Sequence, residues 1–171
     1  MATYVKSCTL SKAVRFTVQV REGFSLDHCQ KKNSGGGSHG FWRSEINGTN
    51  FNSRPAPGKY WAEVCCLNLP PDTFMSASVL IDMIDAYGGI GPGAYGGALV
   101  LQKYREKLPS GYILCPDKKK NLWKDERGFV RVPRIYPDSS GWDYNLDYEH
   151  RNDLSGQLVL IFYPSARFQL S

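Results

Sequence analysis

Three histidines are the residues best suited to acid–base chemistry: His28, His39 and His150. An imidazole titrates near neutral pH, and two imidazoles can cleave RNA as an acid–base pair. His28 and His39 flank a lysine-bearing segment, and His150 precedes Arg151. No spacing among the three is diagnostic, and each also fits a solvated surface position. The sequence therefore favours a protein without a catalytic site and keeps RNA cleavage by these histidines as the alternative.

The cysteines give no sign of a disulfide framework, a zinc site or a catalytic thiol. Their odd number and irregular spacing predict free thiols, and no CxxC pair is present. Cys65 and Cys66 are neighbours in an apolar run, where successive side chains of a strand point to opposite faces. Cys29 follows His28 directly, and sequence neighbours rarely aim at each other. The five cysteines are Cys8, Cys29, Cys65, Cys66 and Cys115.

Alternating polar residues at Asp143, Asn145, Asp147 and Glu149 resemble the start of a calcium-binding loop. The glycine required at the sixth position is replaced by Tyr148, and no bidentate glutamate stands at the twelfth. A half-buried strand explains both these residues and the apolar residues between them. We therefore expect no metal ion and no other cofactor.

The glycine-rich stretch 88–97 contains the spacing GxGxxG at Gly91, Gly93 and Gly96. A phosphate cradle needs a strand before this motif and a helix N-terminus after it. Here the preceding segment has a helical pattern, and Pro92 removes one N–H group. The stretch is interpreted as a flexible loop, like residues 33–40. Its large apolar side chains, Ile90 and Tyr95, are the expected contacts with a neighbouring copy.

A second candidate interface is a basic stretch in which aromatic side chains alternate with cations. Nucleic-acid bases stack on aromatic rings and phosphates pair with cations, so a nucleic-acid surface is one interpretation. A solvated hairpin is the other, since no RNA-recognition motif or DNA-reading helix accompanies it. The residues are Lys118, Lys119, Lys120, Trp123, Lys124, Arg127, Phe129, Arg131 and Arg134.

Charge is segregated along the chain. Residues 1–60 and 99–134 each carry a net charge of +6, whereas residues 61–98 carry −4 and residues 135–171 carry −3. Such blocks can steer a polyanion or let one copy dock on the next. Copies of the protein itself, other particle proteins and nucleic acid are thus the candidate partners.

The elements that must position these residues are mostly strands. Val14, Phe16, Val18 and Val20 alternate with polar residues, which predicts a strand with one buried face. A helix is expected over about 73–87, capped by Asp72 and ended by Gly88 and Gly89. Residues 98–108 fit a second helix or a strand followed by a turn. Further strands are expected at 60–67, 112–115, 129–132, 142–149 and 158–163.

This pattern predicts a mainly β or α+β fold, a largely antiparallel sheet or sandwich of five to seven strands with one or two helices. The length of 171 residues fits a single domain spanning 1–171. The longest apolar run, 158–163, is too short to span a membrane. No apolar signal segment opens the chain, so we expect no secretion and a location in a virion or in the cytoplasm of the producing cell.

Residues 47–65 run from an asparagine-bearing turn through a Pro-Gly pair into an aromatic strand, with Asn50, Asn52, Pro57, Gly58 and Tyr60 at the marked positions. They resemble the opening of knob-like modules in phage and pyocin tail fibres. The tryptophan-ended hairpin that usually follows in those modules has no match here. The resemblance implies a virion-associated β protein.

The leading hypothesis is therefore a non-enzymatic structural or attachment component of a phage-like particle that acts by self-assembly. Charge blocks, glycine-rich arms and aromatic-rich strands suit extended contacts between copies. The alternative is a basic nucleic-acid-binding or RNA-cleaving domain, such as a toxin or a defence-related protein.

Overall fold

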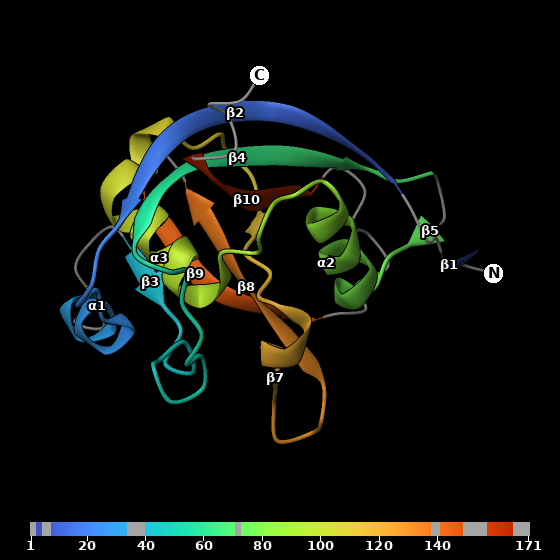
Figure 1. Ribbon diagram of the computed structural model, residues 1–171. Helices are drawn as coiled ribbons and strands as arrows, with labels where there is room; N and C mark the ends of the chain where they lie inside the picture. The colour runs from blue at the N-terminus through green and yellow to red at the C-terminus, as the bar shows by residue number, and fades with distance from the viewer. Residues whose placement is uncertain are drawn as a thin grey trace.

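The computed structural model describes residues 3–4, 8–33, 40–70, 73–137, 141–148 and 157–165. Within them, an eight-stranded mixed sheet has the order β2-β4-β10-β6-β8-β9-β3, with β7 paired to β8, and β1 pairs with β5 separately (Figure 1). The predicted β-rich α+β class is confirmed. The strands are β1 (Thr3–Tyr4), β2 (Thr9–Val20), β3 (Gly40–Trp42), β4 (Gly58–Asn68), β5 (Thr73–Phe74), β6 (Ile113–Leu114), β7 (Trp123–Lys124), β8 (Val130–Pro137), β9 (Trp142–Tyr148) and β10 (Leu158–Pro164).

The helical elements contain fewer residues in total than the strands, and they lie around the sheet. They are α1 (Leu26–Asn33), α2 (Ala77–Ala86), α3 (Gly93–Tyr104), and the short 3-10 turns η1 (Arg105–Lys107) and η2 (Lys119–Asn121). The strand predicted at 14–20 is confirmed as the second half of β2, and its buried residues Phe16, Val18 and Val20 face the core. Strand β2 pairs antiparallel with β4 along its whole length, with a bulge between Lys12 and Val14.

Strand β10 is buried on both faces, which explains its unbroken apolar sequence. Leu160 and Phe162 pack into one core cluster, while Val159 and Ile161 pack into a second cluster on the other face. β4 divides its side chains in the same way. Cys65 joins the second cluster and Cys66 packs against the first, so the predicted opposite orientation of these neighbours is confirmed.

The two longer helices cover opposite faces of the sheet (Figure 1). Ala98 and Val100 of α3 belong to the first cluster, whereas Leu80 and Ile84 of α2 belong to the second. This arrangement gives a helix–sheet–helix packing around β4 and β10.

Helix α2 begins later than the sequence predicted. Thr73 and Phe74 form β5, and Ser76 caps the helix by accepting a hydrogen bond from the Val79 N–H at 3.3 Å. Asp72, the predicted cap, lies outside the described residues. The predicted end is confirmed, because Gly88 adopts a positive φ of 75° and the Gly89 N–H donates to the carbonyl of Ile84.

The interpretation of residues 88–97 as a loop is wrong for their second half. Ile90 forms an antiparallel bridge with Phe162, and α3 begins at Gly93 and includes Tyr95. The glycines serve close packing rather than mobility. A Cβ on Gly96 would lie 2.2 Å from Pro92 Cβ and 3.2 Å from the Phe162 ring. Because Gly96 and Gly97 carry no side chain, α3 can approach the sheet closely.

Residues 98–108, for which two interpretations were open, continue α3 to Tyr104 and then form η1. Residues 142–148 form strand β9, so the prediction of a strand here, rather than a calcium-binding loop, is confirmed. The sheet exceeds the predicted strand number and is not wholly antiparallel, because β6 runs parallel to β10 and β3 runs parallel to β9.

Candidate nucleic-acid interface

An open groove of about 700 Å³ lies beside the β7–β8 hairpin. It brings together four residues of the basic stretch with three residues from the segment between β3 and β4. From the basic stretch come Trp123, Lys124, Arg127 and Arg131; Arg43, Glu45 and Asn50 come from the earlier segment, and Asp125 and Glu126 complete the lining.

Asp125 fixes the shape of the hairpin. Its carboxylate accepts hydrogen bonds from the backbone N–H groups of Arg127 and Phe129, each at 3.0 Å, and from Arg131 Nε at 2.7 Å. Desolvation raises the pKa of Asp125, but these bonds and the charge of Arg131 outweigh it, so the pKa is lowered. Gly128, with φ +80°, completes the turn. The carboxylate thus stays ionised and holds the tip residues in place.

Trp123 presents a half-buried ring at the groove. Its ring centre lies 5.4 Å from that of Phe51, which is buried beneath it. Phe51 is positioned by a turn in which Asn47 Oδ1 accepts hydrogen bonds from the N–H groups of Thr49 and Asn50. The asparagine turn noticed in the sequence therefore supports the aromatic wall of the groove.

The cations of the groove fall into two classes. Arg43 pairs with Glu45 at 3.0 Å, and Arg131 pairs with Asp125 at 2.6 Å. Lys124 and Arg127 are exposed and have no ion-pair partner among the described residues. The first pair of cations shapes the groove, while the second pair is available to an anionic ligand.

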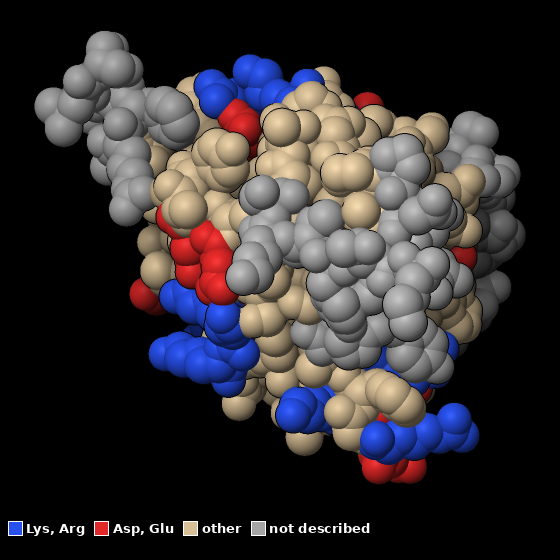
Figure 2. Space-filling view, turned by 90° about the vertical axis from the view of Figure 1, so that its right-hand side faces the viewer, with Lys and Arg blue, Asp and Glu red and all other residues tan. Residues whose placement is uncertain are grey.

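The other lysines of the predicted basic surface lie outside the groove. Lys118, Lys119 and Lys120 are exposed at η2, and Lys119 Nζ pairs with Asp82 of α2 at 2.8 Å. Figure 2 shows the side of the molecule that carries α2, where Lys and Arg atoms form several separate groups, some beside Asp and Glu atoms. Arg134 pairs instead with Asp147 at 3.2 Å. The sequence-predicted surface is therefore divided rather than continuous.

Of the three histidines, only His28 lies within the residues that the structure describes. His28 is exposed on α1, where its backbone N–H donates to Ser25 Oγ at the helix start. His39 and His150 lie outside the described residues. Cys29 beside His28 is buried in the core, and burial raises the pKa of its thiol, which opposes a reactive thiolate. All five cysteines are free thiols in the structure.

The GxGxxG segment does precede a helix, yet it forms no phosphate cradle. Gly91 packs against the carbonyl of Pro116, and the Gly93 N–H donates to that carbonyl at 3.0 Å. The Asp117 carboxylate lies next to Gly93, where a Cβ would be 2.8 Å from Oδ2. A buried carboxyl group of the protein thus occupies the position at the start of α3 that a phosphate would need.

The expected assembly contacts are partly built into the fold. Ile90 exchanges two backbone hydrogen bonds with Phe162, at 2.8 and 3.0 Å, and its side chain is half-buried. Tyr95 is half-buried and packs edge-on against Phe24, with ring centres 6.4 Å apart. Neither residue lies on a free arm.

Sequence reasoning missed Arg43, Asn50 and Phe51, because nothing in their spacing links them to residues 123–131. The asparagine-bearing turn at the start of residues 47–65 was the one available indication. Among the described residues, no three His, Cys, Asp or Glu side chains are grouped as a metal site, and no helix has the length and apolar character needed to cross a bilayer.

No family model, curated protein or solved structure compared with this chain matches it. The resemblance of residues 47–65 to tail-fibre modules therefore stays a prediction.

Proposed function

We propose that the protein binds single-stranded nucleic acid, without cleaving it, through the groove beside the β7–β8 hairpin. The observation that supports this proposal is the convergence of the Trp123 ring with Lys124 and Arg127 in one open groove, where neither cation has an ion-pair partner among the described residues. An aromatic ring stacks a base of any sequence, and cations beside it hold the backbone phosphates. The open shape suits an extended strand better than an enclosed small molecule.

The proposal departs from the leading sequence-based hypothesis of a self-assembling particle component. That hypothesis depended in part on a glycine-rich arm at 88–97, and this segment is folded against β10 and the core. Particle membership stays a prediction that measurement of the mass in solution tests. A large, salt-sensitive assembly would favour it, whereas a monomer that binds a nucleic-acid strand favours the present proposal.

Binding of a fluorescently labelled oligouridine strand of about 16 nucleotides tests the proposal by anisotropy at several salt concentrations. Lys124→Gln with Arg127→Gln should weaken binding several-fold. It should also reduce the slope of log K against log salt by about 1.4, because two phosphate contacts are lost. Lys103→Gln with Lys107→Gln removes the same charge from the end of α3 and η1 and serves as the control. If both double variants weaken binding equally, the groove is rejected as the binding site. If the labelled strand becomes shorter during the measurement, the RNA-cleavage alternative is restored.

A further inference from the structure

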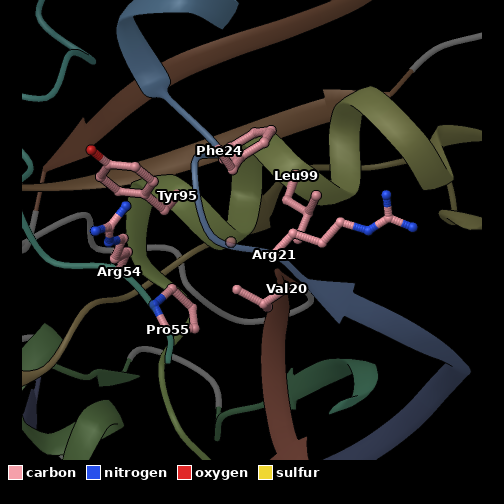
Figure 3. A pocket seen from close by; sticks show the side chains of 8 residues that line it. Val20, Arg21, Phe24, Arg54, Pro55, Tyr95 and Leu99 are labelled. Atoms are coloured by element: carbon pink, nitrogen blue, oxygen red, sulfur yellow. The ribbon is translucent and has the colours of Figure 1, made fainter. Parts of the chain in front are cut away.

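A second hollow lies at the end of β2, between the turn that follows it and α3 (Figure 3). Its wall is apolar and comes from four separate segments. Val20 belongs to β2, Phe24 to the turn after it, Pro55 to the segment before β4, and Tyr95 and Leu99 to α3. The Phe24 and Tyr95 rings meet edge to face, and both residues line the hollow.

The size of the hollow limits what it can hold. Including its open mouth it measures about 250 Å³, but the space that the centre of a water molecule can occupy is about 10 Å³, which is room for one water molecule. A bulky apolar ligand cannot enter without moving the core residue Leu99, which is 3 % exposed. A flat ring that lies across the mouth and contacts the aromatic side chains fits this shape.

Two arginines flank the apolar surface. Arg54 lies on the side of Tyr95, and the Arg21 side chain extends from the other side of the hollow (Figure 3). Both side chains are exposed, and neither has an ion-pair partner among the described residues. A strand that crosses the hollow would therefore meet a guanidinium on each side of a stacked base, and guanidinium groups bind phosphate in a bidentate manner.

The hollow is connected to the groove by one short segment. Asn50 lines the groove, and Arg54 and Pro55 line the hollow. Between them Ser53 is held by Asn121, whose Nδ2 lies 2.8 Å from Ser53 Oγ. Four residue steps of extended chain cover at most about 14 Å. One strand of a few nucleotides can thus contact both places.

We propose that this hollow binds a single base of the strand held by the groove, with the flanking phosphates on Arg21 and Arg54. The inference depends on the proposed nucleic-acid binding and adds a place where one base is recognised by stacking.

The test compares two labelled strands of equal length and charge, an oligouridine and the same backbone without bases. The wild-type protein should bind the base-containing strand on the order of tenfold more tightly, because stacking adds to the phosphate contacts. Phe24→Leu keeps an apolar side chain but removes the ring, so this ratio should fall. Tyr87→Leu removes an exposed ring at the end of α2 and should leave the ratio unchanged.

Trp123→Leu separates this inference from the proposed function, since Trp123 could also stack a base. If Phe24→Leu leaves the ratio unchanged and Trp123→Leu abolishes it, the hollow is rejected while nucleic-acid binding stands. If neither strand binds, the proposed function fails. The hollow is then tested alone with uridine monophosphate, and an absence of NMR shifts at Phe24 and Tyr95 overturns it.

A variant that keeps the core intact guards against loss of folding in Phe24→Leu. Arg21→Gln with Arg54→Gln changes exposed side chains and should weaken both strands several-fold without lowering Tm. The Lys103→Gln and Lys107→Gln pair is again the charge-matched control. Unchanged affinity in the arginine variant would overturn the phosphate contacts of the proposal.

Discussion

At the scale of single residues, Asp117 is a buried carboxyl group in the described core. The residue is 4 % exposed, and Oδ1 accepts a hydrogen bond from the Lys118 N–H at 2.6 Å. Oδ2 is buried and has no hydrogen-bond partner among the described residues. Burial raises the pKa of Asp117 more than the bonds from Lys118, Asn121 and Ser53 lower it. Its negative charge near Gly93 still faces the favourable end of the α3 dipole.

This shift makes stability depend on pH in a definite direction. Because the pKa of Asp117 is higher in the folded than in the unfolded protein, the protonated carboxyl contributes stability at low pH. That contribution is lost as the pH rises through the folded pKa. Asp117→Asn removes the titrating group, so the stability of wild type relative to the variant should fall as the pH is raised from acid to neutral. Urea unfolding at several pH values measures this difference.

Asp125→Asn is the matched control, for which we expect the opposite dependence of stability on pH. The pKa of Asp125 is lowered in the folded protein, so its contribution is present above the unfolded pKa and is lost as the pH falls. The stability of wild type relative to Asp125→Asn should therefore rise with pH. Parallel pH profiles for the two variants would contradict both assignments.

The glycine next to Asp117 gives a second residue-scale prediction. Gly93 has φ +61°, and a Cβ there would meet Asp117 Oδ2 at 2.8 Å. Gly128 has a similar φ of +80°, but nothing lies within 4 Å of its Cβ position. Alanine costs backbone strain of about 1–2 kcal/mol at both positions. Gly93→Ala should cost at least about 1 kcal/mol more than Gly128→Ala, because overpacking is added. Equal losses of unfolding free energy would show that the contact has no energetic weight.

At the scale of elements, α3 decides how residues 88–97 behave. Ile90 and Tyr95 are each half-buried, so their replacement by serine removes apolar contacts inside one chain. Ile90→Ser with Tyr95→Ser should reduce the unfolding free energy by about 2 kcal/mol. For a chain of this length that lowers Tm by about 4–8 °C. The exposed Tyr87→Ser should change stability by less than about 0.5 kcal/mol. An unchanged Tm in the double variant, with weakened self-association, would restore the assembly arm.

The same helix shows where sequence reasoning fails. The alternation of β2 and the apolar run of β10 were readable, because each reflects burial on one or both faces of a sheet. The start of α3 was not, since Gly96 and Gly97 suggest a loop when only local propensity is considered. Their role depends on Phe162 of β10 and on Cys115, which follows β6, because a Cβ on Gly96 would meet the first and a Cβ on Gly97 the second. Close packing by glycine is a tertiary property that no local pattern reveals.

At the scale of the whole molecule, the candidate interface, like α3, could be predicted from the sequence only in part. The basic stretch was visible in sequence, but its division into a groove and a separate lysine cluster depends on ion pairs. Lys119 binds Asp82, and Arg131 binds Asp125. The net charges of the sequence segments therefore do not translate into surface patches of the same charge. What remains for a ligand is decided by which cations the fold has already neutralised.

The position of β10 also has a consequence for synthesis on the ribosome. This strand joins β4 on one side to β6 on the other, and it is the last of the described strands to be made. Until Leu158–Pro164 leaves the exit tunnel, the pair β2–β4 and the group containing β8 and β9 have no shared strand. Each nascent half exposes an open edge and an uncovered apolar face to other chains. The growing polypeptide is therefore most open to chaperones and to misassociation after β8 and β9 have emerged and before β10, the strand that closes the sheet, emerges.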